Sequence, residues 1–141
     1  MANANIGKRL MRAAREAQVH AYSPYSSVKV GAALLASDGT VFLGANIENA
    51  SYGMSVCAER VAAVCALMAG IADWRGLAIA LSGASPSPPC GACCQFLAEF
   101  APSDMVVFWG GDGRSFKSAT LCELLPLRFQ FKKSSASSRR R

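Results

Sequence analysis

The chain has 141 residues, of which 52% are hydrophobic, and its formal net charge is +6. This length and hydrophobic content suit one domain with a sizeable core, since domains cluster near ~100–150 residues. The chain lacks the run of ~18 apolar residues that a membrane span requires, and its first residues lack the apolar centre of a secretory signal. We therefore expect a cytoplasmic protein with no membrane partner.

The positive charge is concentrated at the two ends of the chain. It lies on Lys8, Arg9, Arg12 and Arg15, and then on Lys132, Lys133 and Arg139 to Arg141. A protein that binds a nucleic-acid strand needs a continuous positive track, often with stacking aromatic residues, and the interior of the sequence offers neither clearly. The charge pattern therefore argues against nucleic acid as a partner.

Hydrophobic periodicity and turn residues predict an alternation of helices and strands. In chain order we expect a helix over 6–21, strands over 28–36 and 41–45, a helix over 54–69, a strand over 77–81, a helix from 90 to about 100, and strands over 105–109 and 115–118. Asp38-Gly39 predicts a hairpin between the first two strands. Helices between single buried strands indicate a layered α/β domain over residues 1–131. Residues 132–141, rich in serine and arginine, have too little apolar surface to pack and are expected to form a disordered basic tail.

Two cysteine motifs stand at predicted helix starts. They are Cys57-Ala58-Glu59 and Cys90-Gly91-Ala92-Cys93. Unpaired N–H groups and the helix dipole favour anions at a helix N-terminus, which lowers a cysteine pKa toward the thiolate that a metal needs. The three thiolates would fill three corners of a zinc tetrahedron, which predicts one Zn²⁺ per chain.

The number of protein ligands indicates whether a zinc site is structural or catalytic. Structural zinc sites have four protein ligands, whereas catalytic sites keep one position for water. Glu59, two residues from Cys57 and not itself a ligand, could take a proton from that water and deliver it to substrate. This combination matches the signature of zinc-dependent deaminases, in which the first ligand is His or Cys.

Other readings of the cysteines predict different chemistry. A C-x-x-C motif alone also occurs in thiol oxidoreductases and in zinc modules that only support a fold. A thiol oxidoreductase would not need the upstream Cys-Ala-Glu, and a structural zinc module would need a fourth ligand. Cys94 would point about 100° away from Cys93 on a helix. We expect Cys65 and Cys122 to be core residues and His20 to lie at a helix end or on the surface.

From Tyr22 to about Phe129 the chain resembles the small, homotetrameric, zinc-dependent cytidine deaminases. The stretches YSPYS, VGAALLASDG, GANIENASYG, CAERVAA, SPPCGACCQFLAEF and ELLP occur in the order and approximate spacing of that family. The resemblance implies a three-layer α/β fold, a mixed five-stranded sheet flanked by helices, as the catalytic domain. It also implies a homotetramer with active sites at subunit contacts. The implied reaction is hydrolysis of cytidine or deoxycytidine to uridine or deoxyuridine with release of ammonia, a step of pyrimidine salvage.

The same resemblance suggests roles for four further residues. Asn46 and Glu48 correspond to the pair that hydrogen-bonds the ribose 3′-hydroxyl, which an amide and a carboxylate can satisfy as donor and acceptor. Arg60 corresponds to an arginine that partly neutralises the thiolates. Phe129 corresponds to a phenylalanine that reaches into a neighbouring subunit's site and lies against the base.

Two positions depart from the family pattern. Cys94 stands where the family usually has arginine, and Val28 stands where many members carry an aromatic residue that packs on the nucleoside. The second departure leaves room for a larger base substituent. A modified cytosine nucleoside of the blasticidin type is therefore an alternative substrate, and a nucleic-acid cytosine is a weaker one.

Overall fold

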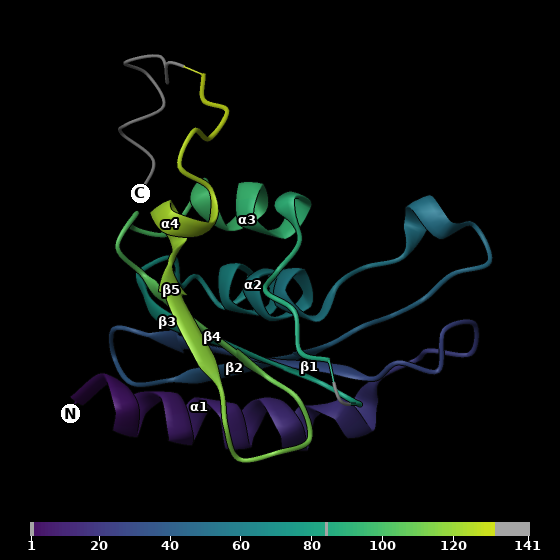
Figure 1. The fold of residues 1–141 in the computed structure, drawn as a ribbon. Coiled ribbons are helices and arrows are strands. Elements are labelled where there is room, and N and C mark those ends of the chain that lie inside the picture. Colours follow the sequence, from purple (N-terminus) through teal and green to yellow (C-terminus); the bar gives the residue numbers. More distant parts are fainter. Residues whose placement is uncertain (1, 84, 132–141) are drawn as a thin grey trace.

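Five strands form one mixed sheet in the order β2-β1-β3-β4-β5 (Figure 1). The strands are β1 (Val30–Ala36), β2 (Val41–Ala45), β3 (Trp74–Leu81), β4 (Val106–Gly110) and β5 (Lys117–Thr120). β3 and β4 are parallel, and the other neighbours are antiparallel. The computed structural model describes residues 2–83 and 85–131, so the expected tail over 132–141 lies outside the described residues.

Helices cover both faces of this sheet, which confirms the expected three-layer α/β architecture (Figure 1). The α-helices are α1 (Ala2–Ala17), α2 (Ala58–Met68), α3 (Gly91–Ala98) and α4 (Leu121–Leu124), and two short 3₁₀ turns are η1 (Gln18–His20) and η2 (Tyr52–Met54). α1 lies against one face, and α2 and α3 lie against the other. Among the described helices, none is long and apolar enough to cross a membrane.

The alternation of side chains along the strands explains the two covered faces. Ala33 and Leu35 of β1 pack in the cluster that contains α1, while Ala32 and Leu34 pack in the cluster that contains α2. Successive side chains of a strand point to opposite faces, so a strand covered on both sides is hydrophobic throughout. This is why the central strands read as continuous apolar runs in the sequence.

Gly44 of β2 allows α2 to lie very close to the sheet. A Cβ atom added to Gly44 would collide with the Ala58 carbonyl oxygen and lie 2.5 Å from the amide nitrogen of Ala62. The face of α2 turned to the sheet is built mostly from alanine, which keeps this approach short. The first turn of α2 is therefore held at a fixed depth, and that turn begins with the first cysteine motif.

Several element ends differ from the expectations by a few residues. α2 begins at Ala58 and not at residue 54, because 52–54 form a 3₁₀ turn and Val56 pairs with Ile47 in an isolated bridge. Gly70, with φ of 78°, ends this helix region as expected. β3 begins at Trp74, since antiparallel pairing with β1 extends that far. β5 covers 117–120 where the sequence predicted 115–118.

Candidate active site

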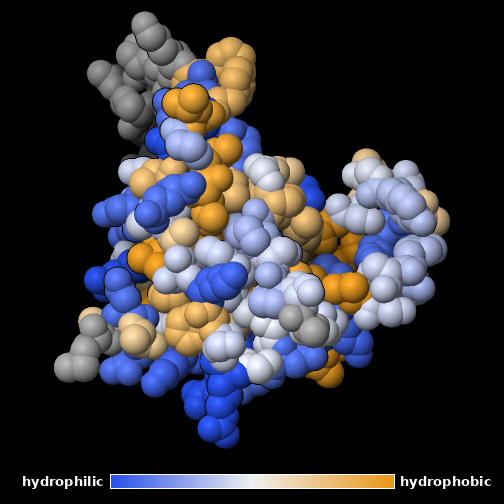
Figure 2. Space-filling model, in the orientation of Figure 1, coloured by the Kyte–Doolittle hydropathy of each residue, from blue (hydrophilic) through white to orange (hydrophobic). Residues whose placement is uncertain are grey.

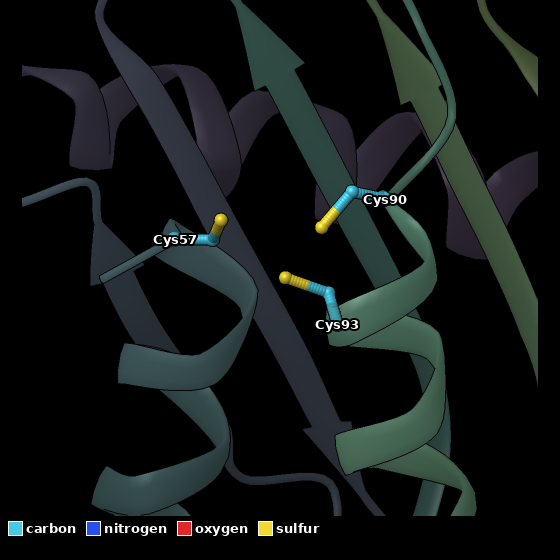
Figure 3. A group of neighbouring side chains, drawn as sticks. All are labelled: Cys57, Cys90 and Cys93. Atoms are coloured by element: carbon cyan, nitrogen blue, oxygen red, sulfur yellow. The ribbon is translucent and has the colours of Figure 1, made fainter. Parts of the chain in front are cut away.

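Two helix N-termini bring three thiols together. Cys57 is the N-cap residue of α2, and Cys90 is the N-cap residue of α3. Cys93 lies one turn into α3 and is buried. The three Sγ atoms lie within 4.8 Å of one another, and Figure 3 shows them converging from the two helices. Among the described residues, these three cysteines are the group of metal-ligand side chains that lie close enough together to hold one ion.

The cluster fits a zinc ion with three protein ligands. Zn–S bonds of about 2.3 Å place the sulfur atoms of a tetrahedral site about 3.8 Å apart, so small side-chain movements would close the triangle. Thiolates are among the ligands that zinc prefers, and three of them leave the fourth position open. Cys90 is exposed, so the open side of the triangle is reached from solvent.

Arg60 supplies positive charge beside the sulfur atoms. Its Nη2 atom lies 3.8 Å from Cys57 Sγ and 3.5 Å from the Ser55 carbonyl oxygen. Hydrogen bonding from Cys93, followed by that from Arg60, lowers the pKa of Cys57 to about 5. The thiolate form of Cys57 is thus favoured before any metal binds, which is the form that a metal requires.

Glu59 is the buried acidic residue of the described chain. Its side chain is 5% exposed, and it follows Cys57 in the first turn of α2. Burial raises the pKa of Glu59 to about 7, because a low-dielectric environment disfavours the charged form. A carboxyl group with a pKa near neutrality can both accept and donate a proton, as general acid–base chemistry needs.

A pocket of about 340 Å³ opens over these residues. Cys57, Glu59 and Cys90 line one end. An aliphatic wall is formed by Val28, Val30, Val56, Ile79 and Leu81. The polar residues of the lining are Asn46, Glu48, Ser26 and Ser55, and Ile47, Ala58, Ser87 and Pro88 complete it. The lining residues include no lysine, arginine or aromatic side chain, so the pocket suits a small neutral molecule with one polar end.

Asn46 and Glu48 reach the pocket but are also engaged with the backbone. Asn46 Oδ1 accepts from the Val30 amide at 2.8 Å, and Nδ2 donates to the Val28 carbonyl at 2.9 Å. Glu48 Oε1 accepts from the amides of Tyr25 and Ser26 at 3.0 and 3.1 Å. Hydrogen bonds from Ser26 and Tyr25 lower the pKa of Glu48. One amide hydrogen of Asn46 remains for a ligand, and the second oxygen of Glu48 accepts neither of these two backbone amides.

Phe129 lies outside the pocket of its own chain. Its side chain is 65% exposed and stacks edge-on against Phe131. Gln95 of α3 holds its backbone, with Nε2 donating to the Phe129 carbonyl at 3.0 Å and the Phe129 amide donating to Oε1 at 3.1 Å. Hydrophobic residues gather over this segment, which follows α4, at the top of Figure 2. The segment is fixed in place but leaves its apolar side chains uncovered.

The remaining cysteines and the histidine lie outside the cluster. Cys94 is buried, and its Sγ contacts the Pro89 carbonyl oxygen at 3.7 Å. The expectation that Cys65 and Cys122 are core residues was wrong, since both are exposed. Cys65 lies on the solvent side of α2, whose alanines take the buried face, and Cys122 lies in the short α4. His20 ends η1, as expected.

Sequence reasoning missed the aliphatic wall and the proline segment of the pocket. Val30, Ile79 and Leu81 were assigned only to strands, and Ser87 and Pro88 were assigned no role. Their position was a usable signal, because these residues lie at or just beyond strand ends, on the side of the sheet where α2 and α3 begin. Ligand sites of layered α/β domains gather at such ends.

Comparisons with known proteins agree with this geometry. The family model "Cytidine and deoxycytidylate deaminase zinc-binding region" matches residues 5–109. The chain belongs to this deaminase family. A cytidine deaminase of Halalkalibacterium halodurans is 47% identical over 117 residues, which cover 83% of this chain and 89% of that protein. A probable cytidine deaminase of Dictyostelium discoideum is 43% identical over 115 residues, covering 81% and 77%.

Solved structures of family members share the fold. The cytidine deaminase of Burkholderia pseudomallei superposes with a TM-score of 0.82 at 41% identity, covering 86% of this chain and 97% of that chain. The cytidine deaminase of Mycobacterium tuberculosis gives 0.71 at 38% identity, covering 87% and 96%. The zinc-binding description of the family and the three converging thiols together confirm the expected zinc cofactor of this deaminase.

Proposed function

We propose that this deaminase converts cytidine and deoxycytidine to uridine and deoxyuridine with release of ammonia. The observation that carries the proposal is the buried Glu59 next to three thiols in a mostly aliphatic pocket whose lining has no lysine or arginine. The proposed metal ligands are Cys57, Cys90 and Cys93, and Arg60 partly offsets their charge. The catalytic domain is proposed to span residues 1–131, in the cytoplasm, where thiols stay reduced.

Zinc and the side chain of Glu59 have different roles in the proposed reaction. Bound zinc supplies the acidity that makes water a nucleophile at neutral pH. The water oxygen bonds to C4 of the base, the bond from C4 to the exocyclic nitrogen breaks, and the amine leaves as ammonia. Glu59 accepts the two protons of the water one after the other: it delivers the first to the ring nitrogen and then passes the second, from the new hydroxyl group on C4, to the leaving amine. Its raised pKa, near 7, suits both transfers.

The charge of the pocket favours a free nucleoside over a nucleotide. The charged groups that line it are the carboxyl groups of Glu48 and Glu59. A 5′-phosphate would meet no lysine or arginine among these lining residues, and the two helix N-termini in the pocket already face the thiols of Cys57 and Cys90. The ribose end would be bound by Glu48 and by the remaining amide hydrogen of Asn46.

A second copy of the chain is proposed to complete the site. The lining residues of the pocket offer no aromatic surface for the base. Leu127, Phe129 and Phe131 are all exposed on a segment that Gln95 and Arg128 hold against α3. Burying such a patch is a common reason for association. We assign Phe129 to a neighbouring subunit's site in a homotetramer.

Val28 supports a second candidate substrate. Its short side chain lies in the aliphatic wall and is 38% exposed. A cytosine nucleoside with a bulkier group, such as a blasticidin-type compound, would find room beside it. A nucleic-acid cytosine is favoured by no observation in the described residues.

Steady-state kinetics on the zinc-loaded protein test these choices. Deamination would be followed by the loss of cytosine absorbance with cytidine, deoxycytidine, deoxycytidine 5′-phosphate and a blasticidin-type nucleoside as substrates. The proposal expects the highest kcat/KM with cytidine or deoxycytidine and at least about a tenfold lower value for the phosphate. A preference for the phosphate would contradict a pocket whose charged groups are carboxyl groups, and a preference for the bulky nucleoside would favour the second candidate.

A further inference from the structure

One wall of the pocket is a proline-rich segment with few anchors. Residues 85–90 lead into the start of α3, and Ser87, Pro88 and Cys90 line the pocket. Within the described chain, residues 85–88 make no hydrogen bond of their own. Pro86, Pro88 and Pro89 restrict the backbone dihedrals here, so the segment is stiff. The position of such a stiff segment is set mainly at its two ends.

The two ends are held in different ways. At the α3 end, the Pro89 carbonyl contacts the buried Cys94 thiol. At the β3 end, Ser82 exchanges hydrogen bonds with Lys29, both at 2.8 Å. The next residue, Gly83, donates its amide to Asp112 Oδ2 at 2.9 Å. Asp112 belongs to the loop after β4, far from the pocket in sequence.

The loop that carries Asp112 is itself fixed from α1. Arg15 donates from Nε to the Gly111 carbonyl at 3.3 Å and from Nη2 to the Gly113 carbonyl at 2.6 Å. Gly111 lies directly against the wall segment, since a Cβ atom there would be 2.7 Å from the Gly83 carbonyl oxygen and 3.8 Å from Pro86 Cδ. A chain of contacts thus runs from α1 through this loop to the start of the wall.

We propose that Asp112, held by Arg15, is a positioning residue for substrate binding. Its carboxylate fixes Gly83, and its loop lies through Gly111 against both Gly83 and Pro86, which is next to Ser87 and Pro88 of the pocket wall. This inference rests on the proposed function, because it assigns the wall a nucleoside to contact. Asp112 does not touch the thiols or Glu59, so it acts on binding and leaves the proton transfers alone.

Substitutions of Asp112 test the role by separating KM from kcat. Asp112→Ala is expected to raise KM for cytidine about tenfold, as loss of one hydrogen bond to a charged group does, with kcat within about twofold. Asp112→Asn keeps an acceptor oxygen at the same place and should recover most of the loss. Asp38→Ala is the matched control, because Asp38 also accepts a backbone amide in an exposed turn, that of Thr40 at 2.9 Å, but lies away from the wall.

A pair of glycine variants tests the same contact from the other side. Gly111→Ala would press on Gly83 and is expected to raise KM, whereas Gly113→Ala adds its methyl group to open space and should not. Equal KM values for these two variants would overturn the inference, and so would an unchanged KM in Asp112→Ala.

A readout without substrate separates this inference from the proposed function. In the zinc-loaded protein, Asp112→Ala should speed hydrogen exchange of the Gly83 amide and shift the backbone amide signal of Ser87 in a nitrogen–proton correlation spectrum. A Ser87 signal at the wild-type position would overturn the role of Asp112. Failure of the wild-type protein to deaminate cytidine would count against the proposed function, while the Ser87 signal would still decide the role of Asp112.

Discussion

Cys57 and Cys90 hold the same position in two different helices: each is the residue at which its helix begins, and their sulfur atoms face each other. The two helices start at the same side of the sheet, so a single metal can be reached from both. Unpaired N–H groups at these helix starts favour thiolates there. The fold therefore brings together thiols that are 33 residues apart in the sequence.

The proposed metal ligands can be tested one cysteine at a time. Serine in place of Cys57, Cys90 or Cys93 should lower the zinc content well below one per chain and abolish turnover, because serine is a far poorer zinc ligand than thiolate. Cys65→Ser and Cys122→Ser are matched controls, since both cysteines are exposed and outside the cluster. Atomic absorption measures the zinc content of each variant. Equal zinc in a ligand variant and a control variant would contradict the assignment.

The role of Glu48 can be tested with a substrate that lacks the 3′-hydroxyl. Wild-type protein should prefer cytidine to 3′-deoxycytidine in kcat/KM by about tenfold or more, as for a hydrogen bond to a charged group. Glu48→Gln should reduce that preference. A variant that lowers kcat/KM for both substrates by the same factor would show that Glu48 acts only through the turn at Tyr25 and Ser26.

The pH dependence of this binding follows from the lowered pKa of Glu48. A carboxyl group whose pKa is lowered by folding stabilises the folded, ligand-ready state at pH values above its ordinary pKa of 4.5. That stabilisation is lost as the pH falls through the pKa of the folded state. Glu48 should therefore stay charged between pH 5 and 9. KM for cytidine, measured between pH 5 and 9, should therefore show no change that comes from titration of Glu48. Any pH dependence of KM in the wild type should be present in Glu48→Gln as well.

Most of the fold could be predicted from the sequence because its signals are local. Asp38-Gly39 predicted the hairpin between β1 and β2, and the helix end expected at residue 69 lies one residue beyond the end of α2. The start of α2 was missed because the bridge between Ile47 and Val56 depends on a contact between distant segments. The capping box of Thr120 and Glu123, which begins α4, was a local signal that was overlooked.

The candidate site could be predicted only where residue chemistry is distinctive. The cysteines and Glu59 form a pattern that few other functions need, and they do converge in the structure. The aliphatic wall could not be predicted, because valine and isoleucine at strand ends also occur in every core. Contacts through Asp112 depend on loops from distant parts of the chain, which periodicity does not report.

Gly44 offers a test of how α2 is placed. Gly44→Ala is expected to lower the free energy of unfolding by about 1–3 kcal/mol, the usual effect of overpacking, and to weaken zinc binding by displacing the first turn of α2. Gly53→Ala is the control, since a Cβ atom there meets nothing within 4 Å. Urea titration of both variants measures the difference, and equal stability would contradict the close approach.

The proposed sharing of sites between subunits has a direct genetic test. Phe129→Ala and Glu59→Gln should each have low activity alone. Co-expressed, the two variants should form mixed assemblies in which some sites combine an intact Glu59 with a neighbour's intact Phe129. Turnover per chain should then exceed the mean of the two separate variants.

The neighbouring phenylalanine serves as the comparison for this experiment. Phe131→Ala removes a similarly exposed ring and is expected to retain most activity. Recovery by mixing would fail if Phe129 acted within its own chain, and a mass of one chain in light scattering would contradict the homotetramer itself.

Glu59 is proposed to move the protons in a zinc-dependent deamination of cytidine. The most direct measurement is turnover of cytidine together with zinc content for wild-type protein and Glu59→Gln, with the exposed Glu16→Gln as control. We expect equal zinc, about one per chain, in all three proteins, and a loss of kcat by about 100-fold or more in Glu59→Gln alone. Wild-type kcat in Glu59→Gln at full zinc content would contradict the account.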